Sequence, residues 1–234
     1  MAKRRKRKKQ KTGKRTPSAK SRDTDVIYIS EYTITDEPML PPAYSRLPEA
    51  VQDRMEELFY DIRIHPREAI EELTALQKLY PHIPQIGNYL VAAYQQAGED
   101  EKAEQIAREN LRRHPNYLFA RINVAEFLLK REEYDKIPKL FDNKFDLKML
   151  YPRRNTFHIT EVVSFMGLMG RYFAGIGQRE TAQTYYNMLR EIAPHDPMTK
   201  ALKRELYPGI VRRIALQTPK KLAAEPNTDE AETP

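Results

Sequence analysis

The chain has 234 residues, 40 of them Lys or Arg and 33 Asp or Glu, with a formal net charge of +7. It contains no cysteine, which excludes disulfides, thiolate metal sites and cysteine nucleophiles. No apolar run approaches the roughly 18 residues of a membrane-spanning helix. The basic N-terminus lacks the apolar core of a signal peptide, so we expect a cytoplasmic protein, or a nuclear one in a eukaryotic host.

Residues 1–22 form a basic segment that contains twelve Lys or Arg and no acidic residue. The rest of the chain then holds 28 basic residues against 33 acidic ones. We expect this arm to be disordered and to bind a polyanion such as RNA or the ribosome, with little sequence preference because it has no aromatic residue. A localisation signal, contact with anionic lipid and a solubilising tail are the alternatives. The unbroken basic run comprises Lys3, Arg4, Arg5, Lys6, Arg7, Lys8 and Lys9.

Residues 23–48 are expected to form an extended linker that contains several prolines. Within it, Asp25 to Thr35 is the one strand-like stretch of the chain, rich in β-branched and aromatic residues. An inert lead-in that covers the first helix is the favoured interpretation, since isolated strands have no independent stability. The alternative is a linear segment that lies along the surface of the helical domain, in the same chain or on a second copy.

From residue 49 onward, a spacing of 34 residues recurs, which is typical of stacked helix–turn–helix units. The pairs that share it are Tyr60 and Tyr94, Ala69 and Ala103, and Pro81 and Pro115. This pattern resembles the tetratricopeptide repeat (TPR), in which two antiparallel helices carry large and small apolar residues at fixed offsets. The resemblance implies an all-α, right-handed solenoid over residues 49–217, with about four units that begin near Ala50, Pro84, Leu118 and Val163.

Glycines and prolines mark the ends of the expected helices. Gly98 and Gly177 are placed to form the tight turns between paired helices. An insertion of about 11 residues falls within residues 142–158, between the third and fourth units. Pro197 to Leu206 is expected to form a capping helix, and residues 218–234 an acidic, disordered tail.

TPR arrays usually bind a peptide or a helix along the face formed by the first helix of each unit. The resemblance therefore implies a concave binding face in this chain. The residues it would place there are Asn88, Gln95, Phe119, Asn123, Glu126, Lys130 and Arg171. A solvated inner surface without a ligand is the alternative. In the insertion, Arg153 and Arg154 lie among aromatic residues, so this segment either binds a phosphate chain or partner, or folds back as an amphipathic flap.

No catalytic constellation, phosphate-binding glycine loop or set of metal ligands stands out, so we expect no enzyme activity, no cofactor and no metal. The function expected from the sequence is a protein–protein adaptor that binds a protein or peptide and is tethered to a polyanion by its basic arm. An RNA- or ribosome-associated protein is the alternative. A structural subunit that self-associates as an oligomer is a third possibility.

Overall fold

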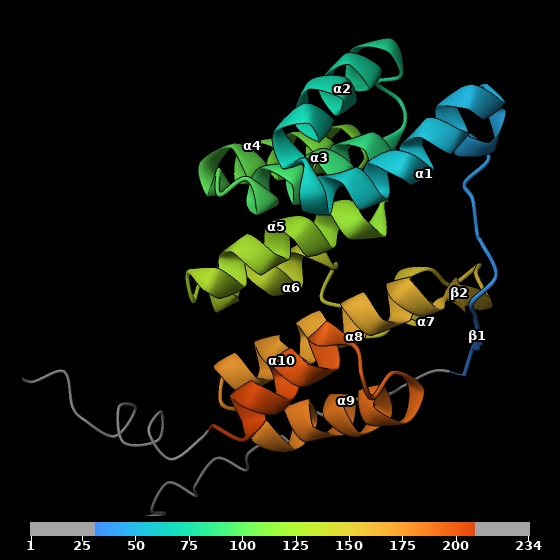
Figure 1. The fold of residues 1–234 in the computed structure, drawn as a ribbon. Helices are drawn as coiled ribbons and strands as arrows, with labels where there is room; N and C mark the ends of the chain where they lie inside the picture. Colours follow the sequence, from blue (N-terminus) through green and yellow to red (C-terminus); the bar gives the residue numbers. More distant parts are fainter. Residues whose placement is uncertain (1–30, 209–234) are drawn as a thin grey trace, which may run out of the picture.

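A computed structural model describes residues 31–208, and these residues are predominantly helical, as expected (Figure 1). The longer helices are α1 (Glu49–Ile64), α2 (Pro66–Leu79), α3 (Pro84–Gln96), α4 (Asp100–Arg113), α5 (Leu118–Lys130), α8 (Ile159–Gly175), α9 (Arg179–Ile192) and α10 (Pro197–Leu206). The short elements are β1 (Thr33–Thr35), η1 (Tyr44–Arg46), η2 (Tyr134–Lys136), α6 (Ile137–Leu140), α7 (Leu147–Leu150) and β2 (Thr156–His158). Within residues 31–208, no helix has the length and apolar character needed to cross a membrane.

The helices pack in an order that follows the chain. α1 contacts α2 and α3, α3 contacts α4 and α5, α5 contacts α8, and α8 contacts α9 and α10. In Figure 1, α1 to α3 therefore lie at one end of the molecule, α5 in the middle, and α8 to α10 at the other end. Buried side chains form one cluster around α1 to α3 and a larger one from α4 to α10.

Several boundaries agree with the sequence analysis. α3 begins at Pro84 and α5 at Leu118, as predicted, while α8 begins at Ile159, four residues before the predicted start. Gly98 and Gly177 have φ angles of +77° and +81°, a conformation that side-chain-bearing residues rarely adopt. These two glycines therefore form the turns expected of them.

The first helix departs from the expected spacing. Tyr60 was matched with Tyr94, but its side chain is 59% exposed, whereas Tyr94 packs against both core clusters. The buried stripe of α1 consists instead of Met55, Leu58 and Ile62. This orientation leaves the acidic residues next to Met55 in water, which avoids the cost of burying their charges.

The second helix of the third predicted unit is short. Only η2 and the four residues of α6 are helical there. Asp142 and Asn143 follow with φ angles of +54° and +56°, and such left-handed residues end a helix. The expected insertion thus starts where α6 stops, and it contains α7 and β2.

The lead-in before the first helix pairs with the insertion, which sequence reasoning missed. β1 and β2 form a two-stranded parallel sheet in which Thr33 faces Thr156. The Thr33 N–H donates to the Asn155 carbonyl oxygen at 2.8 Å, and the rings of Tyr32 and Phe157 meet edge to face with centroids 5.0 Å apart. For Thr33–Thr35, the interpretation of this strand as a cover for the first helix was wrong, since these residues pair with β2 and contact α8 in the same chain. Residues 25–30 lie outside the described residues.

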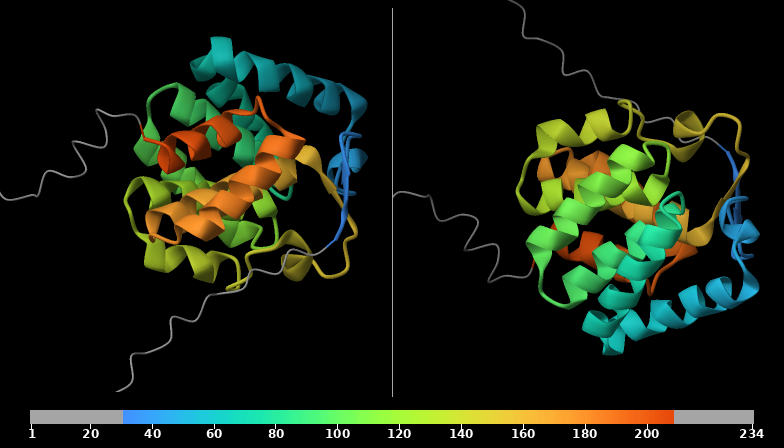
Figure 2. Two further views of the ribbon diagram at one scale, coloured as in Figure 1. Left: turned by 90° about the horizontal axis from the view of Figure 1, so that it is seen from below. Right: turned by 90° about the horizontal axis from the view of Figure 1, so that it is seen from above.

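Beyond β1, the lead-in runs along one edge of the molecule to α1 (Figure 2). Tyr44 and Leu47, at the end of this run, are buried in the cluster around α1 to α3. The lead-in thus connects the α1 end of the helix stack with the insertion that precedes α8. Because it is attached at both places, the lead-in limits the distance between α1 and the insertion.

Two glycines of α8 make room for α10. A Cβ atom at Gly167 would lie 2.9 Å from the Cβ of Met198, and one at Gly170 would lie 2.4 Å from Leu202 Cδ2. The small size of these two residues therefore lets α10 pack closely on α8. Pro197 to Leu206 forms the helix that was predicted.

We expect Gly170→Ala to lower the free energy of unfolding by about 1–3 kcal/mol, because the added methyl group overpacks a buried contact. Leu202→Ala in the same chain should relieve this clash, so the double variant should lose less stability than the sum of the single variants. Urea unfolding of the four proteins measures this coupling. Additive losses would show that Leu202 does not confine position 170.

Candidate binding face

Three separate groups of side-chain contacts join neighbouring helices along the predicted binding face. We call them together the cross-helix row, and in order from α1 to α10 they are Phe59 with Tyr89, Asn88 with Asn123, and Arg171 with Glu126 and Glu205. In its middle, Asn123 Nδ2 on α5 donates to Asn88 Oδ1 on α3 at 2.8 Å. The structure therefore brings four of the predicted peptide-binding residues into contact as two pairs, Asn88 with Asn123 and Glu126 with Arg171.

The ionic end of the row is a shared salt bridge. Arg171 on α8 contacts Glu126 on α5 at 2.6 Å and Glu205 on α10 at 2.8 Å. Burial alone would lower the pKa of Arg171, but the two carboxylates raise it overall. Because its charge is shared by two acids, Arg171 is poorly placed to bind a further carboxylate. The second oxygen of Glu126, Oε1, is buried and has no hydrogen-bond partner.

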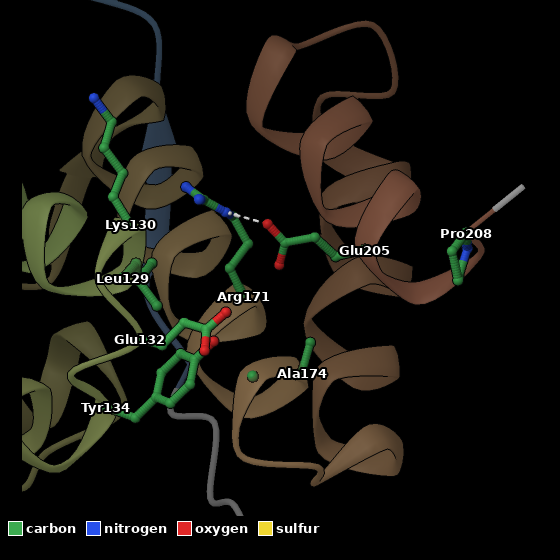
Figure 3. Close-up of a pocket in the computed structure, with 9 residues that line it drawn as sticks. Leu129, Lys130, Glu132, Tyr134, Arg171, Ala174, Glu205 and Pro208 are labelled. Atoms are coloured by element: carbon green, nitrogen blue, oxygen red, sulfur yellow. Dashed lines mark hydrogen bonds and ion pairs between the residues drawn. The ribbon is translucent and has the colours of Figure 1, made fainter. Parts of the chain in front are cut away.

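Beside this salt bridge lies an open hollow of about 330 Å³ between the end of α5, α8 and the end of α10 (Figure 3). Tyr134 and Ala174 contribute to its wall. Lys130 also lines it, but its ammonium group contacts Asp100 at 3.3 Å. This predicted binding residue therefore presents mainly its aliphatic stem to the hollow.

The opposite end of the row is aromatic. Phe59 on α1 is 53% exposed and lies with its ring centroid 5.8 Å from that of Tyr89 on α3. Tyr60 packs edge to face on Phe59 at 5.4 Å. Burial, followed by the nearby Tyr44, Glu56 and Tyr60, raises the pKa of Tyr89 to about 12.

Two predicted residues lie at the margins of the row. Phe119 is half-buried, with its ring centroid 5.8 Å from that of Tyr117 and its side chain packed on the larger core cluster. Gln95 is exposed on the last turn of α3. Both residues are on the expected helices, but neither takes part in the cross-helix contacts.

The basic residues of the insertion are placed differently from one another. Arg153 is exposed, whereas Arg154 makes two hydrogen bonds to Glu161, at 2.9 and 2.6 Å, and lies 4.4 Å over the Phe157 ring. Lys148 donates to backbone carbonyl oxygens of the same segment. These contacts favour the folded-back flap over a phosphate-binding surface. The basic run Lys3–Lys9 lies outside the described residues.

Three members of the row were not predicted from the sequence, namely Phe59, Tyr89 and Glu205. Phe59 was missed because α1 is oriented differently from what the 34-residue spacing predicts. Glu205 was missed because it lies on α10, outside the repeat pattern. Tyr89 follows Asn88 directly and is therefore about 100° further round α3, so the repeat pattern did not place it on the binding face. Among residues 31–208, no group of three or more His, Asp or Glu side chains is arranged to hold a metal ion.

Comparison with known proteins identified no relative of this chain. No known protein-family model matches it, and no curated protein matches it significantly.

We expect Arg171→Met to lower the free energy of unfolding by about 3 kcal/mol at pH 7, because two carboxylates lose their shared cation. Adding Glu126→Gln should recover part of this stability, because it removes one of the two carboxylates that are left without a cation. Urea unfolding of the single and double variants at pH 7 measures both values. A double variant that is no more stable than Arg171→Met would show that Arg171 acts through packing alone.

Proposed function

We propose that this protein is a non-enzymatic adaptor, a TPR-like helical solenoid that binds a protein or peptide along the cross-helix row. Its basic arm, residues 1–22, contacts a polyanion. The partner is held by exposed aromatic side chains at the α1 end and by amide groups in the middle of the row. The ionic end serves mainly to join α5, α8 and α10.

The order of helix contacts supports the repeat part of the proposal. In stacked helix pairs, the first helix of one unit contacts the first helix of the next, and the second helix packs against both. The contacts of α3 with α4 and α5, and of α4 with α5, follow this scheme. The two glycine turns at matching places in two of the helix pairs agree with it as well.

The binding part of the proposal depends on one observation. Phe59 and Tyr60 are exposed beside Tyr89, at the end of the row that leads to the Asn88–Asn123 pair. Aromatic side chains provide large contact areas in protein interfaces. The Asn88–Asn123 hydrogen bond uses one donor and one acceptor, so each amide keeps further capacity for a peptide backbone. A peptide that crosses α1, α3 and α5 would meet both kinds of group.

The alternative is a protein whose principal ligand is RNA or the ribosome. It is favoured by the charge of residues 1–22, since each neutralised phosphate releases a counterion. Among residues 31–208, however, acidic residues slightly outnumber basic ones. The helical domain itself therefore offers little general attraction for nucleic acid.

A capture experiment from lysate distinguishes the two functions. The full chain, a chain that starts at Asp23, and the double variant Phe59→Ala/Tyr60→Ala are used as bait, each with and without nuclease. We expect a protein partner that survives nuclease and loss of the arm but is lost with the double variant, because the aromatic contact area is removed.

Leu79→Ala is the matched control, because Leu79 is a 70% exposed apolar residue on α2, away from the row. This variant should retain the partner. Capture that disappears with nuclease or with the arm would support the nucleic-acid alternative. Equal capture by the Phe59/Tyr60 variant and the Leu79 variant would contradict binding at the row.

A further inference from the structure

The hollow at the ionic end of the row has an excess of negative charge. Glu205, which lines the hollow, shares the single guanidinium of Arg171 with Glu126, which does not line it and whose Oε1 is buried without a donor. Glu132, which lines the hollow, is exposed and makes no ion pair with a described residue. Since the ammonium group of Lys130 is directed to Asp100, a ligand that brings positive charge would be favoured here.

The wall of the hollow is also partly apolar. Leu129, Tyr134 and Ala174 line it between the carboxylates. Figure 3 shows Arg171 and Glu205 joined by their ion pair in the wall of the hollow, with Tyr134 and Ala174 also labelled there. The matching ligand therefore combines guanidinium or ammonium groups with aliphatic side chains.

The last described residue, Pro208, lines this same hollow. The sequence that follows it, residues 209–216, reads GIVRRIAL and has two adjacent arginines among aliphatic residues. Eight residues reach at most about 28 Å when extended, which is enough to cross a hollow at the point where the segment begins. Gly209 permits the chain to reverse direction there.

We propose that residues 210–216 of the same chain bind in this hollow, with Arg212 and Arg213 facing Glu132 and Glu205 and the aliphatic residues against Leu129 and Ala174. A segment tethered this closely has a local concentration in the millimolar range, so a weak intrinsic affinity suffices. The C-terminal segment then covers the ionic end of the cross-helix row. A partner that binds along the row must stop before this end or displace the segment.

Cysteine cross-linking tests this occupancy, because the chain has no native cysteine. The test pair is Ala174→Cys with Ile214→Cys. The thiol at position 174 lies in the wall of the hollow, and the thiol at position 214 lies on the segment. The control pair is Asn187→Cys with Ile214→Cys. Asn187 is exposed on α9 and accepts a hydrogen bond from Gln183, which in turn contacts Tyr207, so it also lies near the end of α10.

We expect the test pair to form its intramolecular disulfide about tenfold faster than the control pair at low salt, because docking raises the local concentration of the thiol. Arg212→Ser/Arg213→Ser should reduce the rate to that of the control, whereas Lys220→Ser/Lys221→Ser, which removes the same charge further along, should not. Equal rates for the two pairs would overturn the proposal. So would a rate that is insensitive to the loss of both arginines.

Disulfides between molecules, with a rate that rises with protein concentration, would place the segment on a second copy and contradict docking in the same chain. The inference uses the same row as the proposed function, but the two can fail separately. Cross-linking measures the C-terminal segment without any partner. Capture by the Phe59→Ala/Tyr60→Ala variant measures the partner at the other end of the row.

Discussion

The central constraint of this fold is that α5 is apolar on nearly every side and must be covered all round. Its sequence, LFARINVAEFLLK, buries nine residues, and no single neighbouring helix could cover them. α3 and α4 pack on it from one end of the molecule, and α6 and α8 from the other. Even Arg121 is buried there, with its guanidinium bonded to the Pro115 carbonyl oxygen and to Asp142. The two ends of the molecule are joined through this helix.

The lead-in adds a second connection between the same two ends. It is anchored by β-pairing beside α8 and by Tyr44 and Leu47 in the cluster around α1. A chain of stacked helix pairs otherwise contacts only its nearest neighbours and can flex along its length. In this chain the lead-in therefore joins the α1 end of the molecule to the segment before α8 by a route separate from the helix-to-helix contacts.

Local patterns in the sequence predicted the features that depend on local physics. The starts of α3 and α5, the glycine turns and the capping helix follow from apolar periodicity and from the backbone preferences of glycine and proline. The pairing of Thr33 with Thr156 joins residues more than a hundred positions apart, and no local signal encodes it. The orientation of α1 was missed because Tyr60 fits the 34-residue spacing, while the burial of Met55 and Leu58 decided the outcome.

The same limit applies to the binding face. The repeat pattern placed Asn88, Asn123, Glu126 and Arg171 on one side, and the structure shows that they contact one another in pairs. Sequence alone could not show that Glu205 neutralises part of the charge of Arg171, because this contact depends on how α10 docks. Under the proposed function, the side chains left free for a partner are therefore those at the aromatic end of the row.

Hydrogen exchange of the full chain, with and without its purified protein partner, tests this account most directly. Our account predicts slower exchange in α1, α3 and α5 when the partner is bound, with little change in α2 and α4, since the partner covers the first helices of the units. Protection confined to α2 and α4, or protection that disappears when residues 1–22 are removed, would contradict the assignment of the binding face to the cross-helix row.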